Sequence, residues 1–209
     1  SLDKKAQHMW DGYMAHFPEV DFWGSPLAVE LQIPADDDTA ARLRTALGIT
    51  DETQVSGRLD LVTVVDQWQL RRIQTRTGLD LPGPGVYVID HKTSGQRDES
   101  FAFKHNNAPQ PHWYQMLLGA ISHGKAPCGA IINRVIGHSQ MDMPRSFQHC
   151  FVPPPTEVMR AALVRQTVRA AEAARADQKN VFACTQIPAG FRTIVCPHLI
   201  AGRCEGMKA

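Results

Sequence analysis

Hydrophobic and polar residues follow two different periods along this chain, and together they predict a mixed α/β fold. Alternation with a period of two predicts strands at 26–34, 57–70, 85–94, 128–137 and 145–153. Apolar positions three or four residues apart predict helices at 3–17, 36–48, 111–124 and 156–177. This order favours an α/β domain with a central mixed β-sheet and helices on its faces.

The boundaries of the domain follow from the same pattern. The strands at 57–70 and 85–94 are joined by a polar stretch that ends in LPGPG, which predicts an antiparallel hairpin with a long tip. Residues 181–209 have no clear period and hold three of the five cysteines. We therefore expect one domain over 1–180, followed by a cysteine-containing C-terminal tail over 181–209.

Composition narrows the class of protein. It is that of a soluble globular protein, and no apolar run approaches the roughly 20 residues that span a bilayer. An odd number of cysteines, five, does not indicate a disulfide framework and favours the reducing cytosol. The chain opens with SLDKK, which shows no signal-peptide pattern. It does not begin with Met, so whether it includes the native N-terminus is left open.

Charge is unevenly distributed, although the net charge is only +1. Residues 1–60 contain 5 Lys and Arg against 11 Asp and Glu, whereas residues 61–209 contain 17 against 10. The positive excess in the second part fits a polyanionic partner bound to one part of the surface. An ordinary solvated surface fits it equally well.

Ionisable residues stand where strands should be apolar. Asp90 and Lys92 point to one face of their strand, because side chains alternate along a strand. Asp60 is a further acid on the strand expected to pair with it. Two carboxylates with a backbone carbonyl suit Mg²⁺ or Mn²⁺, and a nearby ammonium can offset the charge of a phosphate. The alternative is a partly buried ion pair, which stabilises a fold poorly because desolvation opposes the attraction.

These residues carry a family resemblance. The segment GRLD followed by VYVIDHKTSG resembles the core motif of the PD-(D/E)xK nuclease superfamily, and within it the RecB-type and phage-exonuclease-like branch. The resemblance covers roughly residues 1–180 in element order and implies a restriction-endonuclease-like core. It also implies that Asp60, Asp90 and the His91 backbone carbonyl bind Mg²⁺ or Mn²⁺, with Lys92 as the catalytic lysine.

The helix that follows supplies a glutamine in this branch, usually with a tyrosine four residues later. Gln115 stands at the expected place, but Gly119 occupies the tyrosine position. Gln110 and Tyr114 have the family spacing and form the alternative pair. We favour Gln115 because the apolar run after it can pack the helix on the sheet. The resemblance implies that this glutamine hydrogen-bonds the substrate phosphate or a metal-bound water, and the alternative for either glutamine is an ordinary surface residue.

Further metal ligands are implied more loosely. The branch often has a glutamate on the strand before Gly-x-x-Asp, and Glu30 is either that ligand or a solvent-facing strand residue. His8 corresponds either to an extra histidine ligand of some members or to an ordinary surface residue.

The tail has three cysteines, Cys184, Cys196 and Cys204. Several relatives in the branch hold an iron–sulfur cluster with C-terminal cysteines, but this tail lacks their Cys-x2-Cys spacing. His198 near Cys196 makes Zn²⁺ an alternative, and three reduced thiols are another.

The sequence thus predicts a cytoplasmic, Mg²⁺-dependent deoxyribonuclease that hydrolyses phosphodiester bonds. The resemblance favours an exonuclease in DNA recombination, repair or phage DNA processing, with a recombination or single-strand-annealing protein as a possible partner and no membrane. On helix 156–177, Arg165 and Arg169 lie one turn apart and either follow a phosphate backbone or form a solvated face. The alternatives are a catalytically silent DNA-binding or assembly module, an RNA nuclease and a metal-dependent phosphatase.

Overall fold

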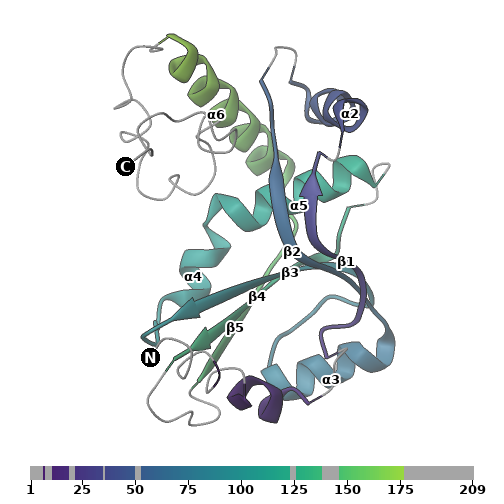
Figure 1. Ribbon diagram of the computed structural model, residues 1–209, viewed down its shortest axis with the longest axis vertical. Coiled ribbons are helices and arrows are strands. Elements are labelled where there is room, and N and C mark those ends of the chain that lie inside the picture. Colours follow the sequence, from purple (N-terminus) through teal and green to yellow (C-terminus); the bar gives the residue numbers. More distant parts are fainter. Residues whose placement is uncertain are drawn as a thin grey trace. The chain divides into compact units, whose positions relative to one another are not determined.

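The computed structural model describes residues 7, 11–18, 22–34, 36–49, 53–122, 126–137 and 146–176. Within them lies one five-stranded sheet with the order β1-β2-β3-β4-β5 (Figure 1). The strands are β1 (Ser25–Ile33), β2 (Gly57–Val65), β3 (Gly85–Ser94), β4 (Gly129–Ile136) and β5 (Phe147–Val152). This confirms the predicted mixed sheet with helices beside it.

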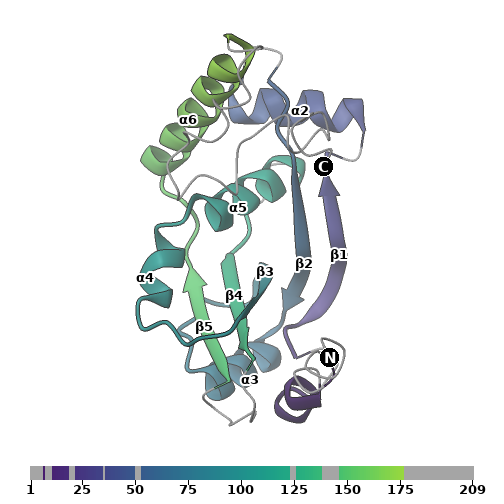
Figure 2. The same ribbon diagram turned by 60° about the vertical axis from the view of Figure 1, so that its left-hand side comes forward.

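The sheet mixes both strand directions. β2 pairs with β3 and β4 with β5 in antiparallel fashion, whereas β3 and β4 are parallel. Figure 2 shows β1 running opposite to β2 at the edge of the sheet. A parallel pair needs a long crossover, and two helices between β3 and β4 supply it.

Helices fill the connections. They are α2 (Asp37–Leu47), α3 (Gln67–Thr77), α4 (Phe101–Asn106), α5 (Pro109–Ile121) and α6 (Glu157–Ala176), and residues 11–16 are also helical. The helices predicted at 36–48, 111–124 and 156–177 are confirmed. Thr156 caps α6 through its hydroxyl oxygen, which accepts a 3.3 Å hydrogen bond from the Met159 amide. None of the described helices is long and apolar enough to cross a membrane.

The predicted antiparallel pairing of the strands at 57–70 and 85–94 is confirmed, because β2 pairs with β3 in this way. The predicted end of the first strand and its polar hairpin tip are wrong, because β2 stops at Val65 and α3 follows at once. The Asp66 carboxylate accepts a 2.7 Å hydrogen bond from the Gln69 amide, and the Gln69 side chain accepts one of 2.9 Å from the Asp66 amide. This capping box satisfies backbone N–H groups at the first turn of the helix, which in a continuing strand would need partners on a neighbouring strand. A helix therefore starts where the sequence pattern continued a strand.

The described chain divides into two compact units. The first takes its residues from 1–31, 59–107 and 127–154, and so contains most of the sheet with α3 and α4. The second takes its residues from 32–58, 108–126 and 155–209, and within it α5 packs against α2 and α6.

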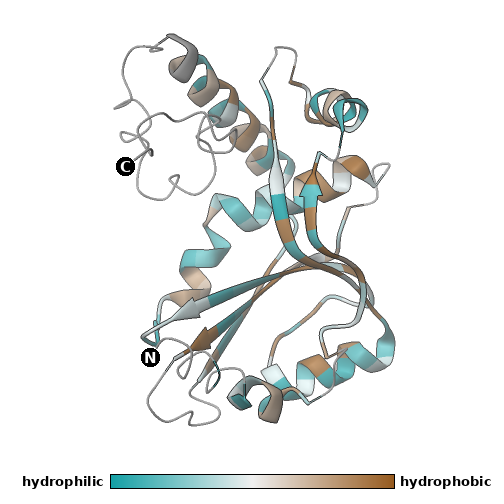
Figure 3. Cartoon of the chain, in the orientation of Figure 1, coloured by the Kyte–Doolittle hydropathy of each residue, from teal (hydrophilic) through white to brown (hydrophobic). Residues whose placement is uncertain are grey.

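The core of the first unit lies on one face of its strands. Side chains from β3, β4 and β5 meet α3 and the segment 11–23 there, and they are Phe17, Phe22, Trp23, Leu70, Ile73, Tyr87, Ile89, Ile131 and Phe147. In Figure 3, α3 carries both brown and teal segments, as expected of a helix that buries one side. The opposite face of β3 and β4 carries Asp90, Lys92 and Arg134, and α4 packs on neighbouring β5.

His149 is the one ionisable group of β5 on the core face. Its ring lies 5.5 Å from Trp23 and 5.8 Å from Phe17, measured between centroids. Burial, helped by the nearby His16, lowers the pKa of His149 to about 4. The folded protein thus keeps this imidazole neutral, and its Nδ1 atom has no hydrogen-bond partner among the described residues.

We expect His149→Phe to flatten the acid limb of the stability curve. In the unfolded chain His149 becomes protonated below about pH 6.5, whereas in the folded protein it becomes protonated only near pH 4. The free energy of unfolding of the wild type therefore falls as pH falls through this window. At pH 4.5 the difference is roughly 2 to 3 kcal/mol. Urea unfolding of both proteins at pH 7 and pH 4.5 measures it, and parallel pH profiles would contradict the assignment to His149.

Candidate active site

The two strand carboxylates lie opposite each other. Leu61 of β2 pairs with Ile89 of β3, and the next antiparallel step opposes Asp60 and Asp90. Instead of continuing the ladder, the His91 amide donates a 2.9 Å hydrogen bond to the Asp60 carboxylate. Asp60 is thereby fixed at the end of the β2–β3 pairing, beside Asp90.

Lys92 completes the group on the same face. Its ammonium nitrogen lies 2.9 Å from the Oδ1 atom of Asp90 and 2.9 Å from Oδ2. Only Oδ1 accepts a well-directed hydrogen bond, so Oδ2 is buried without one. Asp90 is 3 % exposed, whereas the Lys92 side chain is 33 % exposed. The acid is thus inside the protein, and the ammonium reaches its surface.

The electrostatics of Asp90 are unusual for an acid with a lysine partner. Burial is the largest influence and raises its pKa; the charge and hydrogen bond of Lys92 oppose this, while the neighbouring Asp60 carboxylate raises it further. Burial and a second carboxylate therefore outweigh the lysine. An excess of negative charge in a partly desolvated place favours the binding of a cation.

A second pair in the same unit gives a direct comparison. Lys104 lies 2.7 Å from the carboxylate of Asp98, and hydrogen bonds from Lys104 and Ser100 lower the pKa of Asp98 to about 2. Both pairs are short, yet the two aspartate pKa values move in opposite directions. A close lysine therefore does not lower the pKa of Asp90 as it does that of Asp98, because burial and the Asp60 carboxylate oppose it.

The residues present fit a hard divalent cation. Asp60 and Asp90 supply carboxylate oxygens, and one Asp90 oxygen accepts no hydrogen bond. In a strand the N–H and C=O of one residue point to the same neighbouring strand. Because the His91 N–H points to Asp60 on β2, its carbonyl is directed to that edge too.

The His91 side chain lies on the other face of the sheet. Its Nδ1 atom is 3.0 Å from the side-chain amide of Asn133, whose nitrogen also lies 3.4 Å from the Tyr13 hydroxyl. Trp23 donates a 2.8 Å hydrogen bond to the same hydroxyl. These contacts fasten the middle residue of the Asp-x-Lys segment to the core, which holds the backbone between Asp90 and Lys92 in place.

The glutamines belong to α5 in the second unit. Gln115 is 2 % exposed, so it is a packed residue of its helix. Gln110 donates a 2.8 Å hydrogen bond to the Tyr114 hydroxyl, so the alternative pair is in contact, as its spacing of four residues favours. The role of either glutamine beside the carboxylates stays a prediction.

Other predicted ligands do not join this group. Among the described residues, no three His, Cys, Asp or Glu side chains are placed to hold a metal ion, so Glu30 does not complete a set with Asp60 and Asp90. Glu30 is exposed and has a φ of 52°, in the left-handed region, within β1.

Four predicted residues lie outside the described part of the chain: His8, Cys184, Cys196 and Cys204. Their binding of a metal ion or an iron–sulfur cluster stays a prediction. Arg165 and Arg169 are described, and both are exposed on α6.

Two functional candidates were missed by sequence reasoning. The parallel register places Arg134 of β4 directly beside Lys92. His105 of α4 is near both, since burial and then the charges of Lys92 and Arg134 lower its pKa. The signal for Arg134 was available, because a charged residue interrupts the apolar run AIINRVI just as Asp60 interrupts its own strand.

Comparisons of this chain with models of protein families, with curated proteins and with solved structures gave no match. The site is therefore assigned from its own chemistry: two adjacent carboxylates, one of them buried, with a lysine and an arginine on the same sheet face.

Proposed function

We propose that this protein is a metal-dependent DNA nuclease with a restriction-endonuclease-like core, and that Asp60, Asp90 and Lys92 form its active site. The observation that carries the proposal is the pairing of Asp90 with Asp60 in a buried setting, where the pKa of Asp90 is raised despite a lysine 2.9 Å away. A structural ion pair gives no reason for the second acid. A cation site does.

The proposed roles follow from the geometry. Asp60, Asp90 and the His91 carbonyl would hold Mg²⁺ or Mn²⁺, which when bound supplies Lewis-acid stabilisation of charge on the phosphate. The Lys92 side chain is one-third exposed. Its methylene groups would lie along the sheet while its ammonium contacts a phosphate oxygen at the surface. There it stabilises the negative charge that grows during phosphodiester hydrolysis.

The substrate class rests on phosphate chemistry together with the motif resemblance. Lys92 and the neighbouring Arg134 give this face two cations beside the carboxylates, as a phosphodiester backbone requires. DNA is the proposed substrate and partner. An exonuclease of recombination, repair or phage DNA processing is the form that the resemblance favours.

We expect the wild-type protein to degrade linear DNA in Mg²⁺ or Mn²⁺ and to stop in EDTA. End-labelled single- and double-stranded DNA, closed circular DNA and RNA of matched sequence are resolved on one gel. Loss of linear DNA with survival of circles supports an exonuclease. DNA binding without cleavage in any metal would make the protein a binding module, and cleavage of RNA alone would change the substrate class.

A further inference from the structure

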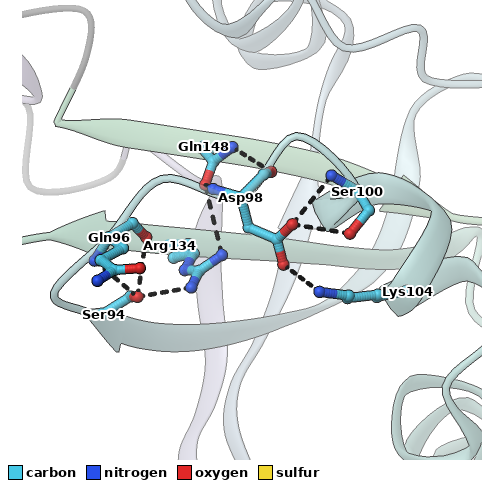
Figure 4. A network of polar contacts seen from close by, with 7 residues as sticks. All are labelled: Ser94, Gln96, Asp98, Ser100, Lys104, Arg134 and Gln148. Carbon is cyan, nitrogen blue, oxygen red and sulfur yellow. Dashed lines mark hydrogen bonds and ion pairs between the residues drawn. The ribbon is translucent and has the colours of Figure 1, made fainter.

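Arg134 lies on the sheet face of the candidate site and is only partly exposed. Its guanidinium is held by neutral groups. Nη2 donates a 2.6 Å hydrogen bond to the Ser94 hydroxyl, and Nη1 donates one of 3.4 Å to the Gln148 side chain (Figure 4). The carbon Cζ lies 5.2 Å from the centre of the Phe101 ring. The side chain is therefore fixed in position without losing its charge.

The two acceptors are themselves fixed. The Ser94 hydroxyl donates its own proton to the Gln96 carbonyl at 2.9 Å, and its oxygen accepts hydrogen bonds from the Gln96 amide at 3.2 Å and from Arg134. The Gln148 amide exchanges two hydrogen bonds with the backbone of Asp98, of 2.8 Å and 3.1 Å. Arg134 is thus preorganised, as a group that must meet a ligand at a set position should be.

No carboxylate among the described residues forms an ion pair with Arg134. The nearest acid in Figure 4, Asp98, directs its carboxylate to Lys104 and Ser100 instead. A partly buried guanidinium without a counter-ion costs free energy, and it retains three of its five N–H donors for a further partner. That cost is explained when the partner is an anion that is absent from the free protein.

A second group shows where that anion belongs. His105 of α4 lies 4.5 Å from Phe101, ring centre to ring centre, and thus contacts the same ring as Arg134. Burial lowers the pKa of His105, and the charges of Lys92 and Arg134 lower it further. Two cations from neighbouring strands therefore act on one imidazole from α4, and their effect on its pKa exceeds that of the Asp98 carboxylate, which raises it.

We propose that Arg134, Lys92 and His105 form a binding site for a phosphate group of the DNA strand that lies on this face of the sheet. The inference rests on the proposed function and deepens it: Arg134 binds the backbone and sets the position of the strand, while Asp60 and Asp90 belong to the cleavage step. The planar guanidinium offers paired N–H groups that match two phosphate oxygens.

Arg134→Gln tests the site, with Arg71→Gln as the matched control. Arg71 is an exposed residue of α3, the helix that packs on the opposite face of the sheet. Binding of a fluorescent oligonucleotide is followed by anisotropy in EDTA, so that cleavage plays no part. We expect affinity to fall about tenfold in R134Q. The slope of log Kd against the logarithm of the salt concentration should also decrease by about one, the value expected for the loss of one phosphate contact. R71Q should match the wild type in both.

Two further arms make the result decisive. R134K keeps the positive charge but lacks the paired N–H donors of the guanidinium. Its affinity should therefore fall in part, while the salt dependence of Kd stays that of the wild type. An oligonucleotide with uncharged methylphosphonate links should bind wild type and R134Q equally weakly. Wild-type affinity and slope in R134Q would overturn the inference, whether or not the protein cuts DNA. If R134Q binds weakly as expected but the wild type cuts no DNA in any metal, the proposed nuclease fails and the phosphate site stands.

Discussion

Asp90→Asn is expected to reduce DNA cleavage by at least about a thousandfold and to leave the protein as stable as the wild type, or more stable. The loss follows because the variant lacks a carboxylate that the cation requires. The gain in stability follows because Asp90 is 3 % exposed and its pKa is raised by burial and by Asp60, so ionising it opposes folding. Asparagine keeps the shape and an acceptor for Lys92. Gel assays in Mn²⁺ and thermal unfolding measure the two quantities.

Asp98→Asn is the matched control, since it also removes a carboxylate that is paired with a lysine, here at 2.7 Å. That pair is exposed on the lysine side, and its loss should change stability little and leave cleavage intact. Cleavage retained in Asp90→Asn would rule out the nuclease assignment. Lost cleavage together with a fall of many degrees in Tm would instead make the Asp90–Lys92 pair a structural element.

The positions of the carboxylates could be predicted well from the sequence. Alternation along β2 and β3 is a local property, so the shared face of Asp60, Asp90 and Lys92 needed only the pairing of two strands. Polar residues at positions where the period demands apolar ones stand out for the same reason. The structure places these three residues together as the alternation required.

Features that depend on local competition were harder to predict. After Val65, the residues Trp68 and Leu70 continue an alternating pattern, which predicts a strand over them. The Asp66–Gln69 capping box decides in favour of a helix, because it satisfies backbone donors at the first turn. The signal is present in the sequence as Asp66 followed by Gln69, but the alternating pattern continues across it.

Features that depend on distant pairing could not be predicted. Arg134 stands beside Lys92 because β3 and β4 pair in parallel across a crossover that contains α4 and α5, and no local pattern sets that register. His105 comes from α4, a six-residue helix inside a stretch interpreted as a loop. The part of the site that β4 and α4 supply, Arg134 and His105, therefore could not be predicted before the strands were aligned.

Lys92→Ala should lower turnover by about a hundredfold or more while the protein still binds Mn²⁺. An ammonium is not a metal ligand, and the carboxylates and the His91 carbonyl remain. Because Lys92 lowers the pKa of Asp90, its removal raises that pKa, so metal binding needs a higher pH and is best measured by calorimetry at pH 8. The expected kinetic signature is a fall in kcat that exceeds any change in KM, since the ammonium acts on charge that grows in the transition state.

Lys104→Ala is the control for this variant, because it removes an exposed lysine 2.7 Å from an aspartate in the same unit. It should leave kcat and Mn²⁺ binding unchanged. A Lys92→Ala protein that cuts DNA at the wild-type rate would reduce the lysine to a partner of Asp90. Loss of Mn²⁺ binding at pH 8 would mean that the ammonium is needed to hold the two carboxylates in place, since the site contains no other cation within 4 Å of Asp90 among the described residues. Retained Mn²⁺ binding with lost turnover is the expected result. It would show that the carboxylates bind the cation and that the Lys92 ammonium acts on the phosphate.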